Sequence, residues 1–532
     1  MKKQILILLS LLLFTWAPAQ NWNQTAKIVA NDRYIADGFG WYVSISGDYA
    51  LVGAPFNDKD ENGENAVISA GAAYFIKKDE SGNWLQTQKI VASDRLQGAQ
   101  FGYAVNINGN HAIVGAFRSS QLNLDGETVF YAGSAYIFEK DEEGFWIQTQ
   151  KIVASDMTET AFFGFAVAIE DNTAIVGAYY DGEDTLAGNT LPLAGSAYIF
   201  ERNLDGEWHQ KQKIVAPDRF AGDMFGVAVD LSGETAIVGA WLENEDASGG
   251  EFMSEAGSAY LFRRDENGVW KHLQKIVASD RSPGDSFGVD VAIDGNYVIV
   301  GAFYEGDDNS VENAGAAYLF ENTGVWTEMQ KVVAPERNKW DEFGLAVSIS
   351  GNHALVGARQ ANLISDTNTL MNAGAAYMFE KNNDGSWDLT QKLTASDGDE
   401  FDAFGISGAI DGNNAIIGAS DENEDSNGEN PLEDAGSVYI FQNGPLGFTE
   451  HGIAVRYTVY PNPTSGQSTI DLGKTYNHTE LIIKNIFGQA VFQKEFENTS
   501  LLSFEINGPA GLYFAQIQIA NNNSTTLKVL KE

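Results

Sequence analysis

One pattern repeats seven times along most of this chain. The dipeptide Phe-Gly recurs at spacings of 56 to 62 residues, beginning at Phe39, Phe101, Phe163, Phe225, Phe287, Phe343 and Phe404. Each copy continues with an apolar run that ends in Gly-Ala, an Ala-Gly that opens a run such as AGSAYIFE, and a Trp five residues before a Lys. Self-similarity at a fixed period is the mark of a repeat architecture, so each copy is expected to build one structural unit.

Within one copy, turn residues separate four short strands. The run FGYAVNIN (Phe101 to Asn108) alternates apolar and polar residues, and HAIVGA after the Gly109-Asn110 turn is apolar throughout, like a strand buried on both faces. AGSAYIFEK and WIQTQKIVAS follow, and helical periodicity is found nowhere. Seven copies of four antiparallel strands predict an all-β fold, a seven-bladed β-propeller, over residues 20–444.

The two ends of the repeat region complement each other. The seventh copy stops after AGSVYIFQN and lacks a Trp-to-Lys strand, whereas residues 22–32 begin with one, NWNQTAKIVAND. We expect residues 22–32 to close the last blade, because a ring closed in this way leaves no free sheet edge.

The first nineteen residues have the pattern of a secretory signal peptide. Lys2 and Lys3 precede an apolar stretch from Ile5 to Phe14, and Ala17-Pro18-Ala19 forms a cleavage site. No other segment is long and apolar enough to span a bilayer. The chain has no Cys, which excludes disulfides, Cys-ligated zinc and thiol catalysis. An exported protein of this size without disulfides favours a bacterial source.

Charge divides the chain after the repeats. Lys and Arg number 33 against 73 Asp and Glu, and the net charge of −40 argues against nucleic-acid binding. Residues 453–532 carry six basic and six acidic side chains, so the excess acid lies in the repeats. Gly and Pro in NGPLGF (Asn443 to Phe448) mark the change, which places a linker at 445–452 and a second domain at 453–532.

The repeated run FG…V.I.G..AIVGA…AG.AYIF resembles the FG-GAP repeats of integrin α-subunit propellers and of many bacterial surface proteins. The resemblance covers residues 22–444 and implies the propeller fold, but a fold alone does not define a function. Integrin-like repeats carry an Asp-rich calcium loop just before the Gly-Ala run. This chain has bare turns there, such as ISGDY and INGNH, so those cation sites do not carry over.

The C-terminal part resembles the type A sorting domain of the Bacteroidetes type IX secretion system. The matching stretches are TVYPNPTSG (Thr458 to Gly466), IIKNIFGQAVFQKEF (Ile482 to Phe496), GPAGLYFAQI (Gly508 to Ile517) and the final LKVLKE. Short alternating strands with Pro, Asn and Gly turns suit a small antiparallel β-sandwich. The resemblance implies that type IX machinery carries the protein through periplasm and outer membrane, to be released or attached to the cell surface.

Much of the acid lies in the loops after Gly-Ala, so one face of the propeller is expected to be negative and to attract a cation or a basic surface. Three loops open like calcium loops, with alternate side-chain oxygens before a Gly: Asp58, Asp60 and Asn62; Asn244, Asp246 and Ser248; Asn423, Asp425 and Asn427. The twelfth position is Glu255 in the fourth copy and Asp434 in the seventh, but Ser69 in the first. Solvated turns explain the same residues, so calcium and purely structural loops both stay open.

The residue directly after Gly-Ala is aromatic in four consecutive copies: Phe117, Tyr179, Trp241 and Phe303. Such an arc near the channel mouth suits stacking on a sugar or on an apolar side chain of a partner, although packing between blades explains it too. Arg359 breaks the repeat at the same position. These five residues are the candidate ligand-binding site.

No catalytic constellation is recognised, since His, Ser and Asp form no nucleophile motif. Paired carboxylates among so many acids leave glycan hydrolysis open. The sequence therefore predicts a secreted or surface-attached binding or adhesion protein, whose acidic loop face recognises a glycan or a protein. A glycan-processing enzyme, hydrolase or lyase, and a structural surface-layer component are the alternatives.

Overall fold

The computed structural model describes residues 20–185, 188–306, 311–364, 369–445, 458–460, 464–485, 489–519 and 523–531. The predicted signal peptide, residues 1–19, and nearly all of the predicted linker 445–452 lie outside these residues. The chain divides into a unit of Gln20–Gly444 and a second unit that contains the residues from Pro445 onward. All regular secondary structure in the described residues is β-strand, so the predicted all-β class is confirmed.

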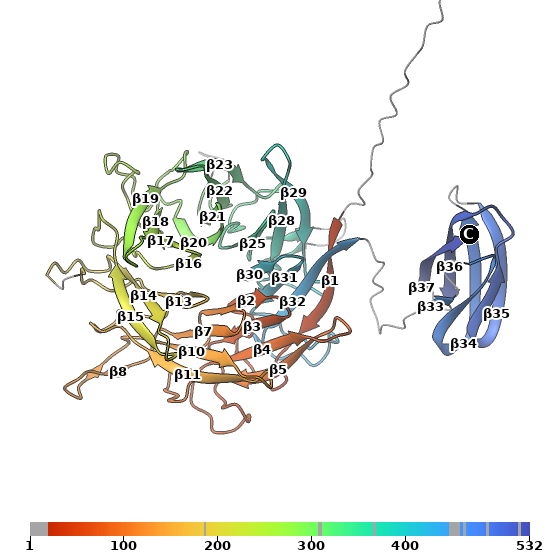
Figure 1. Cartoon of the computed structure of the whole chain (residues 1–532), viewed down its shortest axis with the longest axis horizontal. Coiled ribbons are helices and arrows are strands. Elements are labelled where there is room, and N and C mark those ends of the chain that lie inside the picture. Colours follow the sequence, from red (N-terminus) through yellow and green to blue (C-terminus); the bar gives the residue numbers. More distant parts are fainter. Residues whose placement is uncertain are drawn as a thin grey trace, which may run out of the picture. The chain divides into compact units, whose positions relative to one another are not determined.

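The first unit consists of seven four-stranded antiparallel sheets, the blades, whose first strands contact one another in a closed circle (Figure 1). The strands of blades one to three are β2 (Val43–Ser46), β3 (Tyr49–Ala54), β4 (Ala72–Lys78), β5 (Trp84–Ile90); β6 (Val105–Asn108), β7 (His111–Ala116), β10 (Ser134–Lys140), β11 (Trp146–Ile152); β12 (Val167–Glu170), β13 (Thr173–Ala178), β14 (Ser196–Arg202), β15 (Trp208–Ile214). Those of blades four to six are β16 (Val229–Ser232), β17 (Thr235–Ala240), β18 (Ser258–Arg264), β19 (Trp270–Ile276); β20 (Phe287–Asp294), β21 (Tyr297–Ala302), β22 (Ala316–Asn322), β23 (Trp326–Val332); β24 (Ala346–Ser350), β25 (His353–Ala358), β28 (Ala375–Lys381), β29 (Trp387–Leu393).

Blade seven combines both ends of the unit. Its strands are β30 (Ser407–Asp411), β31 (Asn414–Ala419), β32 (Ser437–Pro445) and, outermost, β1 (Gln20–Ile28). Residues 29–32 of the predicted closing strand lie beyond β1, in the segment that leads to blade one. The side-chain amide of Gln391 in blade six donates to the Trp22 carbonyl at 2.8 Å and accepts from the Trp22 amide at 2.9 Å. β1 is thus tied to two blades.

The glycines of the repeat lie where two blades meet. A Cβ added to Gly133 would lie 2.0 Å from the carbonyl oxygen of Phe163 in the next blade, and φ of Gly133 is +87°. Gly133 and Phe163 form a parallel bridge in place of side-chain packing. The Phe-Gly pair therefore joins its blade to the preceding one, and β6 begins at Val105 rather than at Phe101 as predicted.

The hydrophobic core lies between neighbouring blades. One buried cluster, for example, joins Ile175 and Ile199 of blade three to Val238, Tyr260 and Trp270 of blade four. The second strand of each blade is buried over nearly its whole length, whereas the outermost strands alternate buried and exposed residues. This contrast matches the continuous apolar and alternating runs in the sequence.

Two loops contain small hairpins that the sequence did not predict. β8 (Gln121–Leu122) pairs with β9 (Thr128–Val129) in blade two, and β26 (Leu363–Ile364) pairs with β27 (Thr369–Leu370) in blade six. With two residues in each strand, such hairpins are too short to leave a periodic signal in the sequence.

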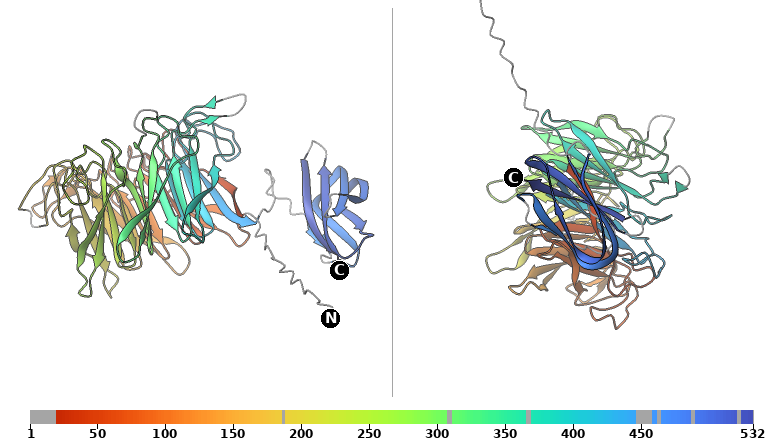
Figure 2. Two further views of the ribbon diagram at one scale, coloured as in Figure 1. Left: turned by 90° about the horizontal axis from the view of Figure 1, so that it is seen from above. Right: turned by 90° about the vertical axis from the view of Figure 1, so that its right-hand side faces the viewer.

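The second unit is a five-stranded antiparallel sheet. Its strands are β33 (Thr458–Tyr460), β34 (Gln467–Asn485), β35 (Ala490–Glu505), β36 (Gly511–Ile519) and β37 (Asn523–Lys531). The long strands β34 and β35 are curved (Figure 2). A buried cluster of this unit includes Ile470, Leu481, Leu502 and Ile517. The sequence predicted a small antiparallel β-sandwich here; the antiparallel β-fold is confirmed, and the described strands belong to one curved sheet.

Candidate functional site

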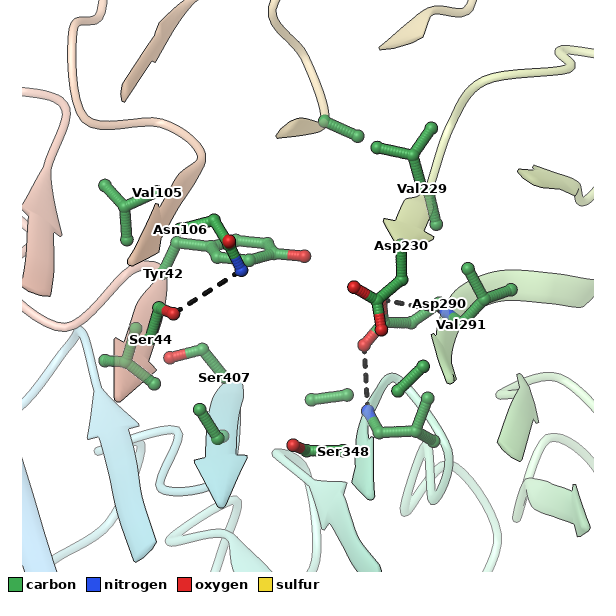
Figure 3. A pocket seen from close by; sticks show the side chains of 18 of the residues that line it. Tyr42, Ser44, Val105, Asn106, Val229, Asp230, Asp290, Val291, Ser348 and Ser407 are labelled. Atoms are coloured by element: carbon green, nitrogen blue, oxygen red, sulfur yellow. Dashed lines mark hydrogen bonds between the residues drawn. The ribbon is translucent and has the colours of Figure 1, made fainter. Parts of the chain in front are cut away.

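The inner strands of all seven blades enclose a central channel. Its cavity has a volume of about 660 Å³ and is lined by residues of β2, β6, β12, β16, β20, β24 and β30 (Figure 3). The loops after the second strands and the connectors between blades lie at one end of the channel, because each inner strand starts at that end. We call this end the loop face.

Neighbouring inner strands are joined across the channel wall by side chains that accept backbone N–H groups. Ser44 accepts from the Ile107 amide at 3.1 Å, and Asn106 accepts from the Ile169 amide at 3.0 Å. Asp230 takes the same role toward Ile293 at 2.8 Å. Each bond satisfies a buried backbone donor and fixes one blade against the next.

Two carboxylates and a phenol project into the channel. Asp230 and Asp290 come from the adjacent blades four and five, and the Tyr42 ring extends from blade one toward them (Figure 3). Burial raises the pKa of Asp230 and of Asp290 to about 7, and the negative charge of Asp290 raises the pKa of Tyr42 well above its usual value. None of these three residues was predicted from the sequence.

A deviation from the repeat distinguishes Tyr42, Asp230 and Asp290 in the sequence. Four copies have Ala at the Tyr42 position, while Asp290 and Ser407 replace it in the fifth and seventh copies. Asp230 lies two positions further along its strand, where other copies have Ser, Asn or Ala.

Aromatic side chains surround the channel mouth on the loop face. Trp41, Tyr103 and Phe165 line it from blades one to three, with ring centroids 5.9 Å and 5.0 Å apart in sequence order. Trp241 and Phe303 line it from blades four and five, with centroids 5.8 Å apart.

The five predicted ligand residues divide between the mouth and the core. Trp241, Phe303 and Arg359 line the channel cavity, whereas Phe117 and Tyr179 pack against Phe165 with centroids 5.3 Å and 4.1 Å away. Phe117 and Phe303 are each only 5% exposed. The Arg359 guanidinium forms an ion pair with the buried Glu342 at 2.7 Å. The structure therefore does not bring the five together as one surface.

The predicted calcium loops use their side-chain oxygens to bind their own backbone. Asp246 accepts N–H groups of Gly250 and Ser248 at 2.9 Å and 2.8 Å, which lower its pKa to about 2. Asp60 and Asp425 accept equivalent amides, and Asp58, Asn244 and Asn423 accept the amides of Ser69, Glu255 and Asp434. Asn62, Ser248 and Asn427 supply amides to this network.

The residues at the twelfth loop position adopt a left-handed backbone conformation. Glu255 and Asp434 have exposed side chains and left-handed φ angles of 56° and 51°. Leu193 has φ of 58° at the same place in blade three. The repeat therefore requires a backbone shape at this position, which side chains other than carboxylates also adopt.

A protein cation already holds each of the three loops. Arg281 of the next connector donates to the carbonyls of Glu245 and Glu251 in the fourth loop. Arg95 and Arg33 bind the first and seventh loops in the same way, at the carbonyls of Asp58 and Asn65 and of Asn423 and Asn430. The side-chain oxygens that an ion would need already accept the loop's own amides, and a guanidinium lies against each loop, so this donor set does not fit a calcium loop.

The Asp-Arg dipeptide in the connectors contacts both neighbouring blades. Asp218 accepts hydrogen bonds from Tyr260 at 2.9 Å and Lys275 at 2.8 Å in the following blade, while Arg219 binds the loop of the preceding blade. Met157 and Gly398 replace the Arg after blades two and six, where the loops contain their own hairpins. We call these contacts of the Asp-Arg dipeptide the clamp. Its signal in the sequence was the recurrence of the dipeptide in the connectors, together with the Tyr and the Lys that recur in each blade.

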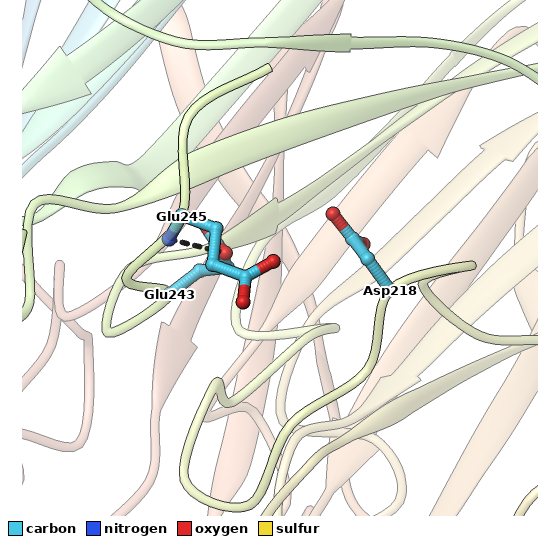
Figure 4. A group of neighbouring side chains, drawn as sticks. All are labelled: Asp218, Glu243 and Glu245. Carbon is cyan, nitrogen blue, oxygen red and sulfur yellow. Dashed lines mark hydrogen bonds between the residues drawn. The ribbon is translucent and has the colours of Figure 1, made fainter. Parts of the chain in front are cut away.

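One acidic group in the described residues has the geometry to hold a metal ion. Carboxylate oxygens of Asp218, Glu243 and Glu245 lie within 4.8 Å of one another (Figure 4). The Lys275 ammonium contacts Asp218 at 2.8 Å and Glu243 at 2.9 Å, so this group also contains a protein cation.

Exposed apolar side chains are concentrated on the loop face. We call the exposed apolar side chains of these loops and connectors the apolar rim. Its members are Tyr34, Ile35, Ile68, Leu96, Leu122, Leu124, Phe130, Tyr131, Leu193, Phe220, Phe252, Trp340, Ile364, Met371 and Phe401. Phe252 and Phe220 are 70% and 62% exposed. The turns at the opposite end carry Phe145, Leu204, Val269 and Val325. The rim was not predicted from the sequence, in which the acid of these loops is the more conspicuous feature.

The blades and their loops define a seven-bladed β-propeller with a loop-bearing face. Seven segments match the family model of the FG-GAP repeat: 22–76, 84–138, 146–200, 208–262, 270–320, 326–379 and 387–441. The chain belongs to the FG-GAP repeat family, as its sequence predicted. Residues 458–532 match the secretion system C-terminal sorting domain, which directs export to the cell surface or the medium. No helix in the described residues has the length and apolar character needed to cross a membrane.

Comparisons with individual proteins add little. No curated protein matches the chain. A crystal structure of a protein from Lactobacillus plantarum is similar with a TM-score of 0.41 and 13% identity, over 68% of this chain and 86% of that one. A likeness at this level carries no argument about function.

Proposed function

We propose that this exported propeller is a non-enzymatic binding or adhesion protein, and that its loop face contacts a protein or a glycan. The apolar rim is the observation that carries the proposal. Apolar side chains exposed together on one face of a water-soluble protein commonly mark an interaction site. The rim belongs to loops and connectors, which hold binding residues more often than the scaffold that supports them.

The charge of the loop face favours a partner with basic groups. Its loops hold much of the acid of the chain, and the Lys and Arg side chains of the clamp neutralise only part of it. A rim of large apolar side chains among acidic loops is complementary to a surface that combines apolar patches with Lys or Arg.

The alternatives make different demands. A glycan hydrolase needs one carboxyl group free to act as acid and one as base or nucleophile. Asp230 and Asp290 are a pair of carboxyl groups in a cavity, but each also joins two blades through a backbone amide. A structural surface-layer role would use the same loop face to contact further copies of the chain.

A binding screen separates these functions. We expect the purified chain to bind saturably to a glycan array or to the surface of intact cells, and to leave the molecule that it binds chemically unchanged. Release of shorter saccharides would place the protein among the enzymes. Ordered self-assembly without binding to any surface would indicate the structural role, and either outcome would contradict the proposal.

Our expectation for calcium follows from the contacts that the three loops already make. We expect millimolar calcium and chelator to give the same melting temperature. An ion that binds only the folded state raises it, but the side-chain oxygens of these loops already accept the loops' own amides, and an Arg lies against each loop. A calcium-dependent rise that Asp246→Ala with Asp425→Ala abolishes would show that the loops bind the ion. A rise that Asp218→Asn abolishes would place the ion at the three-carboxylate group instead.

A further inference from the structure

The channel wall contains two carboxyl groups where other blades use neutral side chains. Ser44, Asn106 and Ser348 join neighbouring inner strands with neutral side chains. Asp230 and Asp290 make the same kind of joint with one carboxyl oxygen, at 2.8 Å each, and their other oxygens accept the amides of Leu231 and Val291. Burying a carboxyl group that can ionise costs free energy that a neutral acceptor avoids, so Asp230 and Asp290 are the residues of the wall best suited to a positively charged ligand.

The phenol of Tyr42 faces the same space. Its ring extends into the channel toward Asp230 and Asp290 (Figure 3), and no hydrogen bond joins its hydroxyl to a residue in the described part of the chain. A hydroxyl of this kind, aimed into a cavity beside two carboxyl groups, is available to a bound molecule.

Cations are scarce in the wall of the cavity. Among the described residues that line it, Arg359 is the one basic side chain, and Glu342 neutralises it. The aromatic side chains of Trp41, Tyr103 and Trp241 surround the mouth on the loop face. Aromatic faces attract cations, most strongly in a desolvated site, and carboxylates accept hydrogen bonds from ammonium groups.

We propose that the channel binds a small organic ammonium ion, with its N–H groups at Asp230 and Asp290 and its carbon body toward the aromatic mouth. The cavity volume of about 660 Å³ suits a small molecule rather than a protein segment. This site lies inside the ring, apart from the exposed rim, so either proposal can fail while the other stands.

Titration of the intact chain with phenethylammonium tests the site, and 2-phenylethanol is the matched neutral probe. Wild type should bind the ammonium and bind the alcohol at least about tenfold more weakly, the effect of losing a charge-assisted hydrogen bond. Asp230→Asn and Asp290→Asn should each weaken ammonium binding to a similar extent. Both variants keep one oxygen for the amide of the next blade, as Asn106 does, and lose only the bond to the amide of the following residue, so the ring should stay folded, which the melting temperature checks.

Two further variants guard the interpretation. Asp223→Asn removes a carboxyl group that is buried in a connector outside the channel, and it should leave ammonium binding unchanged. Tyr42→Leu keeps both carboxyl groups and should weaken binding without unfolding. Equal binding of the two probes, no binding of either, unchanged affinity in both Asp variants, or displacement of the ammonium by millimolar calcium would overturn the proposal.

Discussion

Deletion of residues 20–28 should destabilise the whole propeller. These residues form β1, the outermost strand of blade seven, and Trp22 on this strand is only 3% exposed. The deletion also removes Lys27, which forms ion pairs with Asp397 at 2.8 Å and with the buried Glu422. Loss of the Trp22 side chain alone is expected to cost about 3–5 kcal/mol. A large fall in melting temperature, or insoluble protein, is the expected result.

Point variants give this prediction its control. Trp22→Ala should lower the free energy of unfolding strongly in urea, whereas Asn23→Ala beside it should change it little. Asn23 is half-buried and its side-chain amide reaches only the carbonyl of Asn21. Equal stability of the wild type and the deletion variant would mean that the ring does not depend on β1.

Removal of the C-terminal unit should abolish delivery without unfolding the propeller. The residues that match the sorting domain, 458–532, belong to a different compact unit from Gln20–Gly444. A chain that ends at Gly444 retains all seven blades, so it should melt like the full chain and accumulate in the periplasm. Cell fractionation with an antibody against the propeller measures this directly.

The reciprocal fusion completes that experiment. A signal peptide, an unrelated soluble domain and residues 445–532 in one chain should reach the cell surface or the medium. Normal delivery of the truncated propeller would show that the sorting information lies elsewhere in the chain.

The fold could be predicted from the sequence because each repeat contains the same glycines and the same apolar runs. Gly133 and its equivalents have no room for a side chain, since the next blade's Phe-Gly peptide lies against them. Seven copies of such a constraint leave a periodic signal that a single copy would not. The small hairpins in blades two and six escaped detection because they occur in loops where the repeat varies.

The candidate site was less accessible for the opposite reason. Trp241, Phe303 and Arg359 were found by their position after Gly-Ala, and they do line the channel. Whether a side chain at this position reaches the channel depends on packing, since Phe117 does not line the cavity although Phe303 is equally buried and does. Asp230 and Asp290 lie on different strands, and the ring brings them together through seven-fold geometry that no local pattern encodes.

The loop patterns show how one set of residues supports two interpretations. Asp, Asn and Gly at alternate positions suit both an ion and a turn. Arg281, which binds the fourth loop from outside it, lies more than thirty residues after the Asp246 turn begins. Only the fold places that cation beside the carbonyls.

The affinity of a captured partner for matched variants tests the central claim most directly. Phe220→Ser with Phe252→Ser removes two exposed side chains from the rim, and Phe145→Ser with Leu204→Ser removes two from the turns at the opposite end. The proposal predicts at least about tenfold weaker binding for the rim pair, as expected when buried interface anchors are lost, and wild-type binding for the other pair. Unchanged affinity in the rim pair, with loss in the opposite pair, would contradict binding through the loop face.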